Sequence, residues 1–210
     1  MYFFYILFLF YCLANLSYNF SNLSEKILIL MGYKFNKVEL PSKLIIIGSH
    51  TTIYDFIIGL LFYYTIFHKK YKAHILMKEQ FEKICSPILL LFDKKINLIS
   101  IKSNKNNSIT NQIYEKLKNE DNYIIFLAPE GTRKCTDKIK SGYWYISKNL
   151  DIPIVYMGID YSLKTITLEE DRKGMITWDD EQNEFIKSCK KYVPLYPERC
   201  FWTKNYYSSD

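Results

Sequence analysis

The sequence predicts an α/β domain with a mixed, mostly parallel central sheet flanked by helices, preceded by an apolar helix. Short aliphatic segments typical of buried strands alternate with segments of helical character along the whole chain. The chain has 210 residues, of which 49% are hydrophobic and 24% are charged, enough for one sizeable core. No internal repeat and no long linker divides it.

The first 22 residues are predicted to anchor the protein to a membrane, and residues 23–210 to form the folded domain. No charged residue precedes Glu25, and residues 2–14 are strongly apolar. This stretch is shorter than the ~20 residues that span a bilayer, and it lacks the basic start of a signal peptide. Three alternatives remain: an interfacial helix, a marginal span extended through residues 16–20, or a helix buried on the domain.

The first elements of the domain follow from local signals. Ser24 is a candidate cap for a short helix that stops at Gly32, a residue type common just past helix ends. The aliphatic run 42–49 is closed by Gly and Ser and predicts a buried strand. Residues 55–67 are apolar on all sides and predict a buried helix, and residues 72–78 predict a second strand.

The middle of the chain continues the alternation. Residues 79–92 predict a helix that is interrupted before Pro87, because proline cannot continue a helix from its interior. Residues 95–102 alternate and are rich in β-branched side chains, which predicts a third strand. Apolar residues at helical spacing predict a helix over 107–120.

The last third supplies two further strands and two helices. Residues 122–129 predict a fourth strand, residues 142–150 a short helix, and residues 152–161 a longer strand beside which 164–170 can pair. Residues 179–192 predict an amphipathic helix with an acidic start and a basic end, which suits the helix dipole. The final stretch CFWTKNYY (200–207) suggests either contact with lipid headgroups or a disordered tail.

The amino-acid composition indicates which classes of binding partner are compatible with the protein, but it does not select one of them. The net charge of +6 fits an anionic membrane, a phosphate-bearing substrate or nucleic acid. The 19 tyrosines, 14 phenylalanines and 3 tryptophans are more than a core needs and suit a surface that meets lipid. The five cysteines are scattered without a CxxC pair, so the sequence predicts neither a metal site nor a disulfide framework.

His50 and Asp55 lie just past the first predicted strand, where α/β folds place their ligand crevices. A turn followed by a helix start can bring these residues together, so that Asp55 orients one imidazole nitrogen and the other stays basic. No serine accompanies them, so the nucleophile would be a hydroxyl of the substrate. The alternative is structural: Asp55 caps a helix and His50 fills a turn.

The stretch FLAPEGTRK (126–134) follows the end of a later strand. Gly131 permits an unusual backbone turn, and Arg133 offers a planar fork suited to phosphate oxygens. Glu130 can orient Arg133 or hold a substrate hydroxyl. The alternative is a surface turn closed by an ion pair.

Five motifs in order resemble the glycerolipid acyltransferase family, typified by 1-acylglycerol-3-phosphate acyltransferase, and in particular its short bacterial members. They are HTTIYDF for the family's HTSNWDF, MKEQF for KKELF, PEGTR unchanged, IKSGYWYIS for a lysine-x-glycine with aromatics, and IPIVYMGIDY for VPI…YIDY. Order and spacing hold from about Gly32 to Tyr192. The resemblance implies a glycerol-phosphate acyltransferase-like fold.

The resemblance also implies roles for individual residues. His50 would be the general base that takes the proton of a free glycerol hydroxyl, and Asp55 would orient it. The hydroxyl would attack the thioester of acyl-CoA or acyl-carrier protein, with no acyl-enzyme and no cofactor. Backbone N–H groups at the helix start near His50 are candidates for binding the oxyanion.

The acceptor's phosphate or headgroup would be bound by residues from several segments: Glu130, Gly131, Thr132, Arg133, Lys102, Lys78 and Lys140. One of these departs from the family, because Lys102 stands where arginine is usual. Lysine can meet phosphate as a point charge but not as a fork, which bears on headgroup selectivity.

The expected function is therefore that of a membrane-associated O-acyltransferase of phospholipid synthesis, with its domain on the cytoplasmic side. Its partners would be membrane lipids and a thioester donor, with neither nucleic acid nor metal. Two alternatives stay open: an acyltransferase that remodels lysophospholipids with another headgroup, and a non-catalytic membrane-binding protein that keeps the fold.

Overall fold

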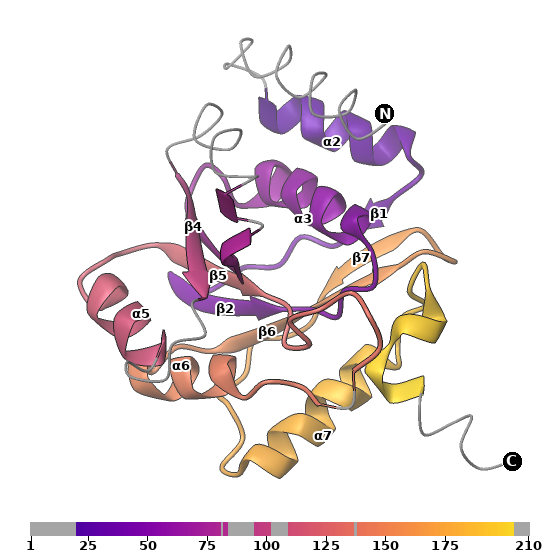
Figure 1. Cartoon of the computed structure of the whole chain (residues 1–210). Helices are drawn as coiled ribbons and strands as arrows, with labels where there is room; N and C mark the ends of the chain where they lie inside the picture. Colours follow the sequence, from indigo (N-terminus) through magenta and orange to yellow (C-terminus); the bar gives the residue numbers. More distant parts are fainter. Residues whose placement is uncertain (1–19, 81, 84–94, 102–108, 137, 204–210) are drawn as a thin grey trace, which may run out of the picture.

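In the computed structural model, a seven-stranded sheet lies between two layers of helices (Figure 1). The structure describes residues 20–80, 82–83, 95–101, 109–136 and 138–203. The predicted α/β class is confirmed.

The sheet has the order β1-β7-β6-β2-β5-β3-β4. All neighbouring strands are parallel except β6 and β7, which are antiparallel. This confirms a mixed, mostly parallel sheet. The strand bounds are β1 Lys34–Phe35, β2 Lys43–Ile47, β3 Lys72–Lys78, β4 Ile96–Ile101, β5 Tyr123–Leu127, β6 Ile154–Asp160 and β7 Thr165–Leu168.

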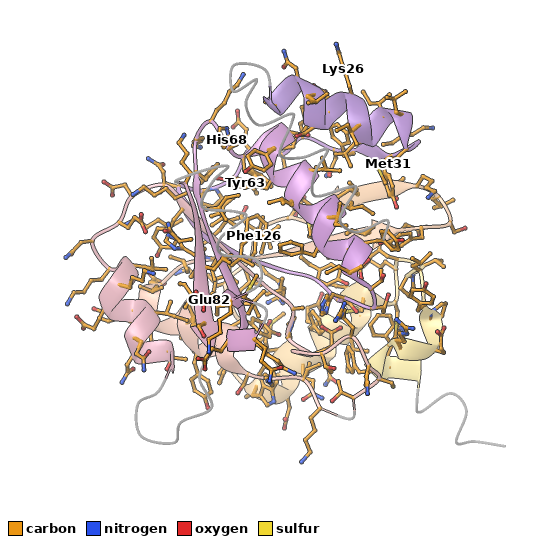
Figure 2. The ribbon with its side chains drawn as sticks, turned by 45° about the horizontal axis from the view of Figure 1, so that its top comes forward. Lys26, Met31, Tyr63, His68, Glu82 and Phe126 are labelled. Atoms are coloured by element: carbon orange, nitrogen blue, oxygen red, sulfur yellow. The ribbon has the colours of Figure 1, made fainter. Side chains whose placement is uncertain are left out.

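Helices α2 and α3 cover one face of the sheet, and helices α5, α6 and α7 cover the other (Figure 1). A separate hydrophobic core fills each interface; on the first face, the rings of Tyr63 from α3 and Phe126 from β5 meet edge to face at 6.0 Å (Figure 2). The helix bounds are α2 Phe20–Leu30, α3 Ile53–Ile66, α5 Ile109–Leu117, α6 Gly142–Leu150 and α7 Trp178–Cys189, followed by the 3₁₀ turns Pro197–Arg199 and Phe201–Thr203.

The predicted elements that lie within the described residues are present, with two corrections. Ser24 does not cap a helix: α2 begins earlier, at Phe20, and Ser24 is fully buried inside it. Helix α2 packs on α3 and ends before Gly32, as predicted; the φ of Gly32 is +84°. Strand β1 was not predicted, because two residues carry no periodicity; it exists through its pairing with β7.

Two predicted segments cannot be compared with the structure. Residues 1–19, which make up nearly all of the predicted membrane anchor, and most of the predicted helix at 79–92 lie outside the described residues. Within the part that is described, no helix combines the length and the apolar character needed to cross a bilayer.

The parallel pairing of β2 and β5 decides where the polar loops meet. Ile47, at the end of β2, lies opposite Leu127, at the end of β5. The N–H of Gly48 then donates to the carbonyl of Leu127 at 3.4 Å. The loops that carry His50 and Glu130 therefore leave the same edge of the sheet side by side, as expected for the carboxyl ends of parallel strands.

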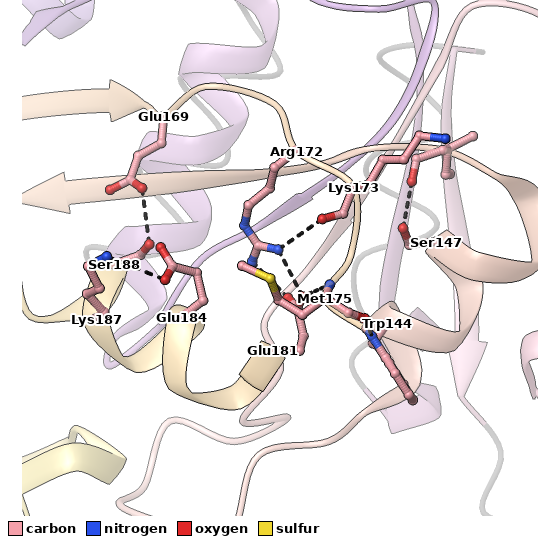
Figure 3. A network of polar contacts seen from close by, with 11 residues as sticks. Trp144, Ser147, Glu169, Arg172, Lys173, Met175, Glu181, Glu184, Lys187 and Ser188 are labelled. Atoms are coloured by element: carbon pink, nitrogen blue, oxygen red, sulfur yellow. Dashed lines mark hydrogen bonds and ion pairs between the residues drawn. The ribbon is translucent and has the colours of Figure 1, made fainter. Parts of the chain in front are cut away.

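A largely buried ion pair ties the segment after β7 to the start of helix α7 (Figure 3). Arg172 donates two hydrogen bonds of 2.8 Å to Glu181, which is fully buried at the start of α7. The N–H of Met175 adds a third at 2.9 Å. Burial alone would raise the pKa of Glu181, but the hydrogen bonds from Arg172 and Met175 lower it, so the carboxylate stays charged.

This arrangement predicts the cost of breaking the pair. Replacing Arg172 with methionine leaves the Glu181 charge buried without its main partner, so Arg172→Met should lower the free energy of unfolding by ~3–5 kcal/mol. The double variant Arg172→Met/Glu181→Leu removes both charges and should be more stable than the single variant. Urea unfolding of the three proteins measures the difference, and a double variant no more stable than Arg172→Met would contradict the prediction.

Candidate active site

The turn that carries His50 is shaped by the start of helix α3. Thr52 is the N-cap residue and forms a capping box with Asp55, the third residue of the helix. The Oδ2 atom of Asp55 accepts hydrogen bonds from the backbone N–H groups of Thr51 at 2.7 Å and Thr52 at 2.9 Å. Asp55 therefore does cap a helix, and the same contacts fix the backbone next to His50.

The other oxygen of Asp55 is occupied as well. Oδ1 accepts a hydrogen bond of 2.5 Å from the hydroxyl of Tyr161, which lies just past the end of β6. The Nδ1 atom of His50 is buried and has no hydrogen-bond partner among the described residues. In this structure Asp55 thus holds the backbone beside His50, and its predicted bond to the Nδ1 atom is not formed.

Burial raises the pKa of Asp55, while the hydrogen bonds from Tyr161, Thr52 and Thr51 oppose that rise. Because three donors converge on a carboxyl group that is 8% exposed, its two oxygens have little freedom to turn elsewhere.

His50 lies in a positive environment. Its pKa is lowered to about 4, first by burial and then by the charges of Arg133 and Lys78. At neutral pH the imidazole is therefore uncharged and can accept a proton. The three residues come from different predicted segments: His50 follows strand β2, Lys78 ends strand β3 and Arg133 follows strand β5. Their charge interactions show that the structure brings these segments together.

The backbone of the loop after β5 requires a glycine at position 131. The φ of Gly131 is +61°, a left-handed conformation that favours glycine. A Cβ atom at this position would also lie 2.8 Å from the Nζ atom of Lys140, whose side chain crosses the glycine. The backbone N–H of Lys140 donates to the carbonyl of Pro129 at 3.0 Å, and Thr132 Oγ1 accepts from the N–H of Lys134 at 3.2 Å.

Glu130 is not on a surface turn but 6% exposed. Burial raises its pKa to about 7, although the nearby Ser49 hydroxyl and the N–H groups of Glu130 and His50 lower it; the charge of Asp55 adds to the rise. Ser49 Oγ approaches this carboxyl group without reaching full hydrogen-bond geometry, and Glu130 Oε2 has no partner among the described residues. Glu130 therefore lies buried against the loop that carries Ser49 and His50, so the two predicted stretches are in contact.

The remaining residues predicted to bind the headgroup differ in their exposure and in whether the structure describes them. Lys78 and Lys140 are exposed beside the site, and Arg133 is half-buried. Lys102 lies outside the described residues, so its role stays a prediction.

The expectation for the oxyanion is wrong for three of the N–H groups near His50. Those of Thr51 and Thr52 donate to Asp55, and that of Tyr54 donates to Thr52 Oγ1 at 3.3 Å. For the N–H of Ile53, the first residue of α3, the expectation stays a prediction.

Two residues of the site were not predicted from the sequence. Tyr161 belongs to the IDY motif at the end of β6, but nothing local shows that its hydroxyl reaches Asp55. Arg199 Nη1 donates to the carbonyl of Thr51 at 3.2 Å from near the end of the chain, where no motif marks it. In the stretch 200–207, Cys200 and Phe201 are buried, so its first residues are not a disordered tail. Residues 204–207 lie outside the described residues, so contact with lipid headgroups stays a prediction.

The described residues contain no group of three or more histidine, cysteine, aspartate or glutamate side chains placed to hold a metal ion. A family model described as "Acyltransferase" matches residues 34–160, which is more than half of the chain and includes both loops of the site. No curated protein and no solved structure shows a significant match.

The charges around His50 predict its titration. In the free protein, the imidazole of His50 should titrate near pH 4 rather than near its ordinary value of about 6.5. Removing the charge of Arg133 with Arg133→Gln should raise this pKa, because the protonated ring is then repelled less. NMR titration of labelled histidine measures both values, with Lys190→Gln, an exposed charge at the end of α7, as the control. An ordinary pKa in the parent, or no rise in Arg133→Gln, would contradict the assignment.

Proposed function

The chain belongs to the acyltransferase family, and we propose that it transfers a fatty acyl group from an acyl thioester to the free hydroxyl of 1-acylglycerol-3-phosphate at a membrane. The observation that carries the proposal is a half-buried, neutral imidazole, that of His50, whose pKa is lowered by burial and by the charges of Arg133 and Lys78 on neighbouring segments. Such a site suits a substrate that combines a hydroxyl group with an anionic headgroup.

The chemistry follows from these residues. The neutral His50 takes the proton of the acceptor's hydroxyl as that oxygen attacks the thioester carbonyl. The tetrahedral intermediate then collapses, the carbon–sulfur bond breaks, and the imidazolium returns the proton to the leaving thiolate. Acyl-CoA or acyl-carrier protein supplies the thioester, and no acyl-enzyme forms. No protein nucleophile is required.

The acceptor's phosphate would also tune the base. A pKa of about 4 makes the free imidazole a weak base, since general bases work best with pKa values near the operating pH. A phosphate placed against Arg133 and Lys78 offsets the two charges that depress this pKa. The base therefore strengthens when an anionic acceptor is bound, which favours a phosphate-bearing lysolipid over an uncharged alcohol.

Exposed apolar side chains support association with a membrane. At the end of α2, Ile29, Leu30 and Met31 are 59%, 87% and 43% exposed, and Lys26 points outward from the same helix (Figure 2). This helix directly follows the uncharged, largely apolar sequence of residues 1–19. With a net charge of +6, the proposed binding partner is an anionic bilayer on the cytoplasmic side.

An activity assay tests the reaction. The parent should acylate lysophosphatidic acid with acyl-CoA or acyl-carrier protein, and His50→Ala should lower kcat by ~10²–10⁴-fold, because general-base assistance is lost. His68→Ala, just past the far end of α3, is the matched control and should keep parental activity. Circular dichroism confirms that the variants are folded.

Two experiments identify the acceptor. The first is an assay of the protein with a panel of lysolipids. The second is expression in a strain lacking its own lysophosphatidate acyltransferase, with the lipids that change measured by mass spectrometry. Preference for another headgroup would replace the proposed acceptor, and absence of turnover with every thioester would remove the enzymatic proposal.

Vesicle binding tests the membrane contact. Ile29→Ser/Leu30→Ser should weaken co-sedimentation with anionic vesicles by ~10-fold or more, because two exposed aliphatic side chains no longer enter the lipid. Ile176→Ser removes an apolar side chain that is 89% exposed before α7 and serves as the control. Equal binding by both variants and the parent would exclude this surface.

A further inference from the structure

The end of the described chain returns to the active site. Residues 197–203 form two 3₁₀ turns that lie beyond the matched family range of 34–160. From the first of these turns, Arg199 reaches the loop of His50 and donates a hydrogen bond of 3.2 Å to the carbonyl of Thr51. The two residues are 148 positions apart in the sequence.

Thr51, the residue directly after His50, is held at both ends. It is 1% exposed, so its backbone groups need partners within the protein. Its N–H donates to Asp55 and its carbonyl accepts from Arg199. The two peptide units that flank the Cα atom of Thr51 are therefore held, the one shared with His50 by a carboxylate and the one shared with Thr52 by a guanidinium group.

Arg199 is itself held in place. Its guanidinium carbon lies 4.1 Å from the centre of the Tyr196 ring, an arrangement typical of cation–π stacking. Glu198 approaches Arg199 at only 3.9 Å and is largely exposed, so it contributes little.

The turn that carries Arg199 is anchored on two sides. The ring of Phe201 stacks on Phe185 of α7 at 5.8 Å. The Cys135 thiol, two residues past Arg133, donates to the carbonyl of Cys200 at 3.2 Å. The carboxyl-terminal segment thus links the loop of His50 to the loop of Arg133.

We propose that Arg199 is a positioning residue of the acyltransferase reaction. It acts through the Thr51 carbonyl, keeping the turn that presents His50 in one conformation while the acceptor hydroxyl is deprotonated. This role rests on the proposed function. Since a misplacement of about 1 Å can cost ~10²-fold in rate, loss of the clamp should lower kcat by ~10- to 10²-fold and leave the KM of the lysolipid unchanged.

The test compares Arg199→Ala, Arg199→Lys and the control Lys190→Ala, an exposed cation in the same part of the chain. Arg199→Ala should show the loss in kcat, and Arg199→Lys should recover part of it, because an ammonium group can still donate to the Thr51 carbonyl. Lys190→Ala should match the parent. The NMR signal of the His50 ring should shift or broaden in Arg199→Ala alone.

Two other outcomes would contradict a positioning role for Arg199. A raised KM for the lysolipid with unchanged kcat would make Arg199 a headgroup ligand. A lower melting temperature with parental kcat and an unchanged His50 signal would make it a purely structural residue. The His50 signal is read without substrate, so it tests Arg199 even if the parent shows no acyl transfer, a result that would count against the proposed function alone.

Discussion

The hydrogen bonds that converge on the buried carboxylate of Asp55 are the interaction on which the site depends. The carboxylate receives two backbone N–H groups from Thr51 and Thr52 and the hydroxyl of Tyr161. Two of these donors come from the loop between β2 and α3, and the third lies just past the end of β6, so one side chain of α3 joins its own helix to this loop and to a strand end. Because the group is buried, each donor offsets part of the cost of removing charge from water. The position of His50 is a consequence of this convergence.

A second constraint is the excess of positive charge around the imidazole. Arg133 and Lys78 depress the pKa of His50, and no bond from Asp55 to Nδ1 compensates. Such an arrangement is unfavourable for a protonated base and favourable for an incoming anion, so the site is electrostatically complementary to an anionic group such as phosphate. Glu130, whose pKa is raised to about 7, adds a buried carboxyl group beneath the same loops. The electrostatics of the free protein and the proposed substrate are therefore linked.

The order of the sheet turns separate sequence motifs into one site. Strands β2 and β5 are neighbours and parallel, so the loops after Ile47 and Leu127 emerge together. Strand β3, on the other side of β5, delivers Lys78 to the same edge. The carboxyl-terminal 3₁₀ turns then cross to this edge and touch both loops, through Arg199 and Cys200. The loops of His50 and Arg133 are thus both in contact with a segment outside the matched family range.

The sequence by itself determined the local elements and the chemistry-bearing residues. Helix α6 was predicted at Gly142–Leu150 and strand β3 at Lys72–Lys78, and both bounds are confirmed, because apolar periodicity and turn residues act over a few positions. Only the tertiary structure decided which donors bind Asp55, that Glu130 is buried, and that Arg199 holds Thr51. These depend on strand order and on contacts between segments up to 148 positions apart, for which no local pattern exists. The misplaced cap at Ser24 has the same cause, because its burial within α2, which packs on α3, is a tertiary contact.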